Sequence, residues 1–160
     1  LYLGDPLNWR LPVRATLMES AAGALSLRTV DVRRQEDARR ARWNGRAPAQ
    51  LYFQTPTPHD FKALGELGGV LTVTLLIHEA PTAPVFLRMD GTYPRAGALD
   101  VTETLGAQQL DQEVVLSWPL QAWADAGAPL EHIDTPFLLW TKGRLELTLL
   151  TVKITALGSA

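Results

Sequence analysis

The side chains best suited to chemistry lie in one short stretch, from Arg33 to Trp43. This stretch carries five arginines and two carboxylates and ends at a tryptophan. Arginine guanidinium groups bind oxygen atoms through paired N–H donors, so the stretch is suited to a polar floor beneath a hydroxyl-rich ligand, or to an interface with another domain. The alternative is a solvated hairpin whose charges neutralise one another, because exposed ion pairs add little stability.

Aromatic rings offer a second kind of chemistry, since an indole or phenol ring stacks well on the apolar face of a sugar ring. Trp118 and Trp123 stand among apolar neighbours, and we expect both in the core. We expect exposed platforms at Trp43, just before the turn Asn44-Gly45, and at Tyr93, although both also suit ordinary surface aromatics. The rings available are Trp9, Trp43, Tyr52, Tyr93, Trp118, Trp123 and Trp140.

A carbohydrate site assembled from these two features would combine stacking rings with hydrogen-bond donors. Its predicted rings are Trp43 and Tyr93. Its predicted donors are Arg40 and Arg42 from the charged stretch, together with Arg95, which follows Tyr93 in the loop that begins at Asp90. Stacking would supply affinity, and hydrogen bonds to hydroxyls would supply selectivity.

Metal binding is suggested only by scattered carboxylates. Glu36, Asp37 and Asp100 are candidate ligands for a structural calcium ion, because hard cations take oxygen ligands. They lack the fixed spacing of a calcium-binding loop. We therefore expect that no cofactor is required, and leave a structural calcium ion as an open alternative.

Catalytic motifs are absent from the sequence. His59, His78 and His132 stand in unrelated contexts without a zinc-binding spacing, and there is no nucleophile elbow or phosphate-binding glycine loop. Carboxylate pairs for glycoside hydrolysis can be drawn from Asp111, Glu113, Glu131 and Asp134. Sequence alone does not place two of them about 5 to 9 Å apart, so we predict no catalytic residue and no enzyme activity.

The composition limits the possible partners. The chain has 160 residues, no cysteine and a formal charge of -2. This charge argues against nucleic acid and also against an acidic polysaccharide, because such partners need a basic face. No apolar run approaches the roughly 20 residues of a membrane span. The chain begins at Leu1 without a methionine, and we expect it to be a piece of a larger protein.

The elements that would position these residues are short strands. Apolar and polar residues alternate near 25–32, 71–77, 85–89 and 145–154, with Phe86 and Arg88 opposite the apolar face of their strand. The phase slips by one residue at Leu149-Leu150, which predicts a β-bulge. Short helices are expected within 60–67 and 119–126. The pattern predicts one all-β domain over 1–160, an antiparallel jelly-roll β-sandwich with little helix.

Several blocks resemble one known family. The most specific runs from Val30 to Arg40 and continues with Trp43-Asn44-Gly45; further blocks are Leu1–Asp5, Gly69–Ile77 followed by Ala80–Val85, Gly97–Thr102, Pro119-Leu120, Ala124–Ala128 and Asp134–Phe137. Together they resemble the C-terminal galactose-binding-like, carbohydrate-binding-module-like domain of bacterial glycoside hydrolase family 3 exo-β-glucanases and β-glucosidases.

The resemblance implies a non-catalytic accessory domain that contacts β-linked glucan and serves the catalytic domains of a parent hydrolase in the periplasm or outside the cell. The alternative is a structural domain that packs against those catalytic domains without binding sugar. The family's nucleophile and acid/base belong to its other domains, and its catalytic barrel alone needs about 250 residues, so no residue here inherits a catalytic role.

Overall fold

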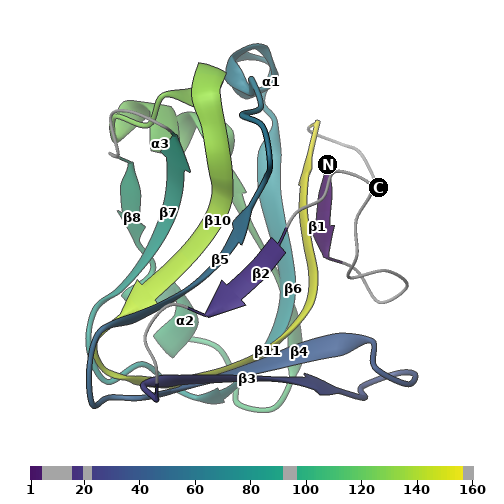
Figure 1. The fold of residues 1–160 in the computed structure, drawn as a ribbon, viewed down its shortest axis with the longest axis vertical. Helices are drawn as coiled ribbons and strands as arrows, with labels where there is room; N and C mark the ends of the chain where they lie inside the picture. Colours follow the sequence, from purple (N-terminus) through teal and green to yellow (C-terminus); the bar gives the residue numbers. More distant parts are fainter. Residues whose placement is uncertain (5–15, 20–22, 92–96, 157–160) are drawn as a thin grey trace.

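The computed structural model describes residues 1–4, 16–19, 23–91 and 97–156. They form two antiparallel sheets packed face to face (Figure 1). The first sheet has the order β3-β4-β11-β6-β9, and β1 also pairs with β11. The second sheet has the order β2-β5-β10-β7-β8. The strands are β1 (Tyr2–Gly4), β2 (Thr16–Glu19), β3 (Leu25–Val30), β4 (Ala38–Asn44), β5 (Ala49–Gln54), β6 (Val70–Glu79), β7 (Val85–Gly91), β8 (Ala98–Asp100), β9 (Glu113–Pro119), β10 (Ile133–Thr141) and β11 (Arg144–Thr155).

Helices are short, as the sequence predicts, and the antiparallel β-sandwich is confirmed. They are α1 (Lys62–Glu66), α2 (Thr102–Gly106), α3 (Leu120–Asp125) and the 3-10 turn η1 (Leu130–His132). Helices α1 and α3 lie at one end of the sandwich (Figure 1), where Trp123 of α3 is fully buried and its Nε1 donates to the Leu87 carbonyl at 3.1 Å. No helix in the described parts of the chain is long and apolar enough to cross a membrane.

The core forms because each strand sends alternate residues inward. In β6, Leu71, Val73, Leu75 and Ile77 are buried, while the residues between them are partly exposed. Trp123 joins this core as predicted, and Trp118 on β9 packs against it while remaining half-buried.

The predicted bulge in β11 is confirmed. The register of β11 against β6 shifts between Leu149 and Thr151, and both Leu149 and Leu150 are buried. Before the shift β11 pairs with β4 on its other side, and after it β11 pairs with β1. A bulge bends a strand, which accounts for the strong curve of β11 in Figure 1.

The charged stretch forms a hairpin of β3 and β4, but its tryptophan does not lie on the surface. Trp43 is only 1% exposed, and its Nε1 donates to the Ala49 carbonyl at 3.0 Å. The prediction of an exposed Trp43 platform is therefore wrong. Strand alternation places Trp43 with buried Ala41 on the core side, whereas Arg40 and Arg42 face outward.

Asp37 holds the turn between β3 and β4 together. Its buried carboxylate accepts backbone N–H groups from Val32, Arg33 and Arg34 at 2.8, 2.9 and 3.2 Å. Burial alone would raise the pKa of Asp37, but these donors favour the ionised form and hold the pKa below its ordinary value. The carboxylate is thus an anchor for this turn.

Replacing this anchor gives a pH-dependent test. At pH 7 we expect Asp37→Asn to lower the free energy of unfolding by about 2 kcal/mol, as for other hydrogen bonds to a charged group. The Asp37 carboxyl has a lower pKa in the folded protein than in the unfolded chain, so its ionised form stabilises the fold. This stabilisation is complete at pH values above the unfolded pKa, and it is lost as the pH falls through the folded pKa. Urea unfolding of both proteins should therefore converge as pH drops below about 4. The exposed Asp125→Asn is the control; a pH-independent difference for Asp37→Asn would contradict the anchor role.

Trp43 provides a second test, on packing. Trp43→Ala should lower the free energy of unfolding by about 3 to 5 kcal/mol, because it leaves a large cavity and an unpaired Ala49 carbonyl. The same truncation at exposed Arg46 should change it by less than about 0.5 kcal/mol. Urea denaturation measures both, and a loss below about 1 kcal/mol at Trp43 would show that its side chain is not in the core.

Candidate functional site

The predicted site residues are divided between the surface, the core and the undescribed part of the chain. Arg40 and Arg42 lie side by side on the outer face of the first sheet. Trp43 lies on the opposite side of the same strand, in the core. Tyr93 and Arg95 fall outside the described residues.

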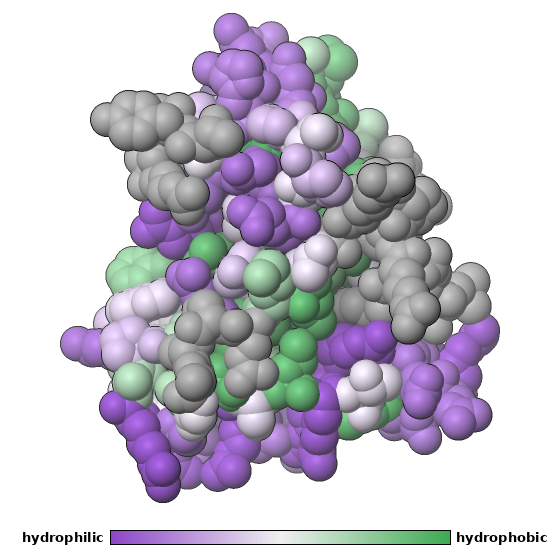
Figure 2. Space-filling view, viewed as in Figure 1, coloured by the Kyte–Doolittle hydropathy of each residue, from purple (hydrophilic) through white to green (hydrophobic). Residues whose placement is uncertain are grey.

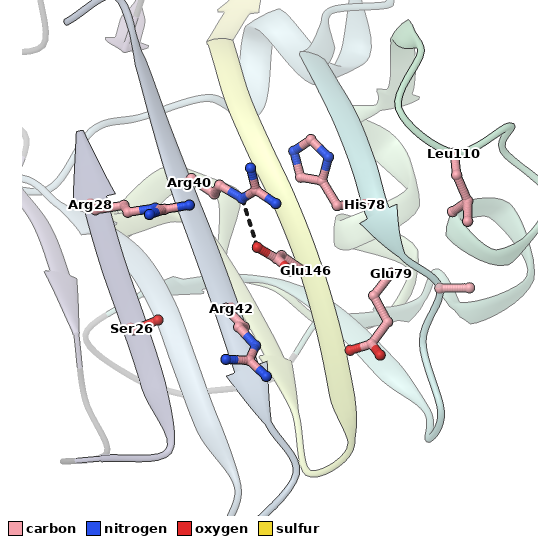
Figure 3. Close-up of a pocket in the computed structure, with 9 residues that line it drawn as sticks. Ser26, Arg28, Arg40, Arg42, His78, Glu79, Leu110 and Glu146 are labelled. Atoms are coloured by element: carbon pink, nitrogen blue, oxygen red, sulfur yellow. Dashed lines mark hydrogen bonds and ion pairs between the residues drawn. The ribbon is translucent and has the colours of Figure 1, made fainter. Parts of the chain in front are cut away.

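Arg40 and Arg42 line an open cleft of about 640 Å³ on the first sheet, here called the arginine cleft. Strands β3, β4, β11 and β6 each place side chains there (Figure 3). The Arg40 Nε donates to Glu146 Oε2 at 2.6 Å. Its lining residues are Ser26, Arg28, Arg40, Arg42, His78, Glu79, Ala80, Leu110 and Glu146. Arg40 and Arg42, predicted as hydrogen-bond donors, thus lie in the same cleft as Arg28.

The outer face of the second sheet has a different character. Cross-strand pairing places Gln50, Trp140 and Phe86 in one row. The neighbouring row contains Tyr52, Leu138 and Arg88, again on three adjacent strands, and Met18 extends it at the sheet edge. Because neighbouring strands lie about 4.8 Å apart, each row crosses the sheet as a continuous line of side chains.

Several side chains of these two rows, together with Asp90, line a cleft of about 470 Å³, here called the aromatic cleft. The Phe86 and Trp140 rings lie 5.8 Å apart between centroids and are tilted by 41°. Neither ring is fully buried, so both present part of their surface to solvent. The cleft is lined by Gln50, Phe86, Arg88, Asp90, Leu138 and Trp140.

An ion pair fixes the polar side of the aromatic cleft. The Arg88 guanidinium bonds to the Asp90 carboxylate, with Nε 3.3 Å from both oxygens and Nη2 3.2 Å from Oδ1. The Asp90 side chain is 5% exposed, whereas that of Arg88 is 32% exposed. Asp90 therefore orients a guanidinium group that remains accessible beside the two rings.

Hydrophobic and hydrophilic side chains are both present on this side of the molecule. In Figure 2, which shares the direction of Figure 1, hydrophobic side chains gather around the position of β2, with hydrophilic ones above and below. Met18 of β2 is 36% exposed and is one of the large exposed hydrophobic side chains.

The aromatic cleft was not predicted as a site, although a signal for it was present. Phe86 and Arg88 lie opposite the apolar face of their strand in the sequence pattern, and Tyr52 and Trp140 are among the available rings. The same alternation in β5 and β10 places Tyr52 and Trp140 on the outward side. The sequence pattern does not reveal that β10 pairs with β5 and β7, and this pairing is what brings the residues of the cleft together.

The candidate metal ligands have other roles. Both Asp37 oxygens accept backbone N–H groups, and Asp100 accepts the Thr102 hydroxyl and backbone N–H, which together lower the pKa of Asp100. Glu36 lies in the β3–β4 turn with a φ of 57°. Residues 1–4, 16–19, 23–91 and 97–156 contain no group of three His, Asp or Glu side chains arranged to hold a metal ion. A structural calcium ion stays the open alternative that the sequence left.

The acidic and histidine candidates for catalysis also make structural contacts. His78 bonds through Nδ1 to Asp111 Oδ1 at 2.6 Å and through Nε2 to Thr148 Oγ1 at 2.7 Å. Glu113 pairs with Arg33. The Asp134 carboxylate accepts the Thr135 hydroxyl at 3.0 Å. The His78 and Glu113 contacts connect neighbouring strands and loops, whereas the Asp134 bond lies within β10.

Several solved structures share this fold. The exo-1,3/1,4-β-glucanase ExoP of a Pseudoalteromonas species matches with a TM-score of 0.68 and 20% identity, over 86% of this chain and 17% of the glucanase. The separate extra C-terminal domain of that enzyme matches with a TM-score of 0.62 and 21% identity, over 89% of this chain and 82% of the domain. This chain thus spans a small part of the whole glucanase.

A carbohydrate-binding module has the same fold over its whole length. The family 30 module of a cellulosomal cellulase of Clostridium thermocellum matches with a TM-score of 0.68 and 13% identity, over 99% of this chain and 98% of the module. Among curated proteins, none is similar enough in sequence to match. These likenesses show that the chain has the fold of that extra domain and of that binding module.

The sequence itself matches a family model over nearly its full length. The matched segment is 1–154, which includes both sheets and both clefts. It also covers the charged hairpin and the strands that carry the resemblance noted in the sequence. The chain therefore belongs to the Exop_C family of galactose-binding domain-like proteins.

Proposed function

We propose that this domain binds a β-linked glucan in the aromatic cleft and serves as the accessory domain of a family 3 glycoside hydrolase acting in the periplasm or outside the cell. The observation that carries the proposal is the pairing of Trp140 with Phe86 beside the Arg88–Asp90 ion pair. Similarity in fold to a carbohydrate-binding module and to the extra domain of a β-glucanase supports it.

Each part of the aromatic cleft has a task in this proposal. Trp140 and Phe86 offer ring faces for the apolar side of glucose units. The β-linked glucan has such faces along its length, and two rows of side chains provide contacts for more than one unit. Burial of ring surface supplies the affinity, because it removes apolar area from water.

Polar residues of the cleft select among sugars. Arg88 can donate to hydroxyl oxygens, and Asp90 holds its guanidinium in a fixed orientation. Gln50, opposite Trp140 in the sheet, carries both a donor and an acceptor. A sugar hydroxyl placed wrongly leaves such groups unpaired, which costs binding free energy.

Trp140 is the residue whose loss should affect glucan binding most. Isothermal titration of the chain with cellotetraose and laminaritetraose should detect binding, and Trp140→Ala should weaken it at least about tenfold, as for an aromatic residue at the centre of a binding surface. Val115→Ala is the matched control, because Val115 is a 61% exposed hydrophobic residue on the first sheet.

Two results would overturn the proposal. The first is that neither tetrasaccharide gives a binding heat at millimolar concentration. That result would favour the alternative of a structural domain that does not bind sugar. The second is equal affinity of Trp140→Ala and the unsubstituted chain for both sugars, which would remove the aromatic cleft from the site. Circular dichroism and urea unfolding would establish that the variants are folded.

A further inference from the structure

The arginine cleft is not used by the proposed glucan site, yet it concentrates positive charge. Arg28 on β3 and Arg40 on β4 are directly opposite in the sheet, and Arg42 follows two residues along β4 on the same face. Figure 3 shows all three side chains between β3 and β11. Like charges directly opposite on neighbouring strands are destabilising. The domain thus retains an unfavourable pairing at this face.

The two carboxylates of the cleft are bonded to arginines other than Arg28 and Arg42, although Glu146 stands directly opposite Arg42 in the sheet. Glu146 accepts the Nε of Arg40, and Glu79 pairs with Arg144 at 2.7 Å. Arg28 and Arg42 are exposed, and within the described parts of the chain neither makes an ion pair or a side-chain hydrogen bond. Two guanidinium groups therefore remain available at the sides of the Arg40–Glu146 pair.

The lining of the arginine cleft favours a charged ligand over a neutral one. Among the described residues that line it there is no tryptophan, tyrosine or phenylalanine, so these residues offer a neutral sugar no ring on which to stack. Guanidinium forks match the geometry of carboxylate and related oxyanions through paired hydrogen bonds. The affinity of this cleft must therefore come mainly from charge.

The cleft also suits a sugar better than an acidic protein surface. Protein interfaces usually have an apolar core. Within the described part of the chain, Ala80 and Leu110 are the apolar residues of the lining, and the cleft is a hollow of about 640 Å³. Ser26 and Glu146 add groups that can bond to hydroxyls, and His78 is held at the wall by Asp111 and Thr148.

We propose that the arginine cleft is a second carbohydrate site, for an acidic glycan whose carboxylate or sulfate group lies between Arg28 and Arg42 beside the Arg40–Glu146 pair. The site is on the outer face of the first sheet, opposite the aromatic cleft, and does not depend on it. The formal charge of -2 describes the whole chain, whereas a ligand in the cleft meets the local arginine charges.

Two oligosaccharides test which anionic group the arginine cleft binds. Trigalacturonate carries carboxylate groups, and a sulfated galactan tetrasaccharide carries sulfate groups. Isothermal titration at low salt should detect at least one of them, with affinity falling as salt is raised, because salt screens exposed charges. Whichever binds more tightly identifies the anionic group. Cellotriose is the neutral comparison and should not bind in this cleft.

Three variants locate the binding. Arg28→Gln and Arg42→Gln should each weaken acidic glycan binding at least about tenfold, through loss of a charge-assisted hydrogen bond. Arg46→Gln removes the same charge from an exposed residue outside the cleft and should change the affinity less than about twofold. In contrast, Trp140→Ala should leave acidic glycan binding unchanged, which separates this site from the proposed glucan site.

The proposal fails if neither acidic oligosaccharide binds at millimolar concentration in low salt. It also fails if Arg46→Gln weakens binding as much as Arg42→Gln, because the attraction would then be nonspecific. If both acidic glycans fail while Arg42→Gln weakens association with an acidic catalytic domain of a family 3 hydrolase, the face is a protein interface and the glycan proposal is wrong.

Discussion

Strand alternation is the constraint on which both clefts depend. A β-strand sends successive side chains to opposite faces, so every residue that fills the core determines which neighbours face solvent. Leu87 in β7 and Leu139 in β10 are buried, and Phe86 and Trp140 beside them are therefore turned outward. In β4 the same rule buries Ala41 and Trp43 and exposes Arg42. Core and surface are thus determined together.

Strand order then decides which outward side chains become neighbours. Strand β10 lies between β5 and β7, which places Trp140 beside both Gln50 and Phe86 although these residues are far apart in the sequence. In the first sheet, pairing of β3 with β4 places Arg28 opposite Arg40, and pairing of β4 with β11 places Arg42 opposite Glu146. The bulge after Leu149 keeps the second half of β11 in the core as the strand bends.

Local features of this fold could be predicted from sequence because their causes are local. Period-two patterns identified the strands near 71–77 and 145–154, the phase slip at Leu149-Leu150 identified the bulge, and Trp123 was correctly placed in the core. Trp43 was misplaced because its charged neighbours suggested exposure, although the alternation of Arg40, Ala41, Arg42 and Trp43 already indicated an inward ring.

The sites were harder to predict, because each is made by strand pairing rather than by a motif. Arg40 and Arg42 lie on the surface, as predicted hydrogen-bond donors should, but Arg28 beside them was not among the predicted donors. Trp140 and Phe86 are widely separated along the chain, and only the pairing of β10 with β7 joins them. Long-range pairing of this kind leaves little trace in a single sequence.

The central claim is that β-linked glucan binds on the outer face of the second sheet. The most direct test is to follow backbone amide chemical shifts by NMR while cellotetraose or laminaritetraose is added. Each strand has its own amide signals, so the signals that move identify the strands that contact the sugar. The account predicts that the largest shifts fall on β5, β7 and β10, around Gln50, Phe86 and Trp140. Shifts confined to β3, β4, β11 and β6, or no shift at millimolar ligand, would contradict it.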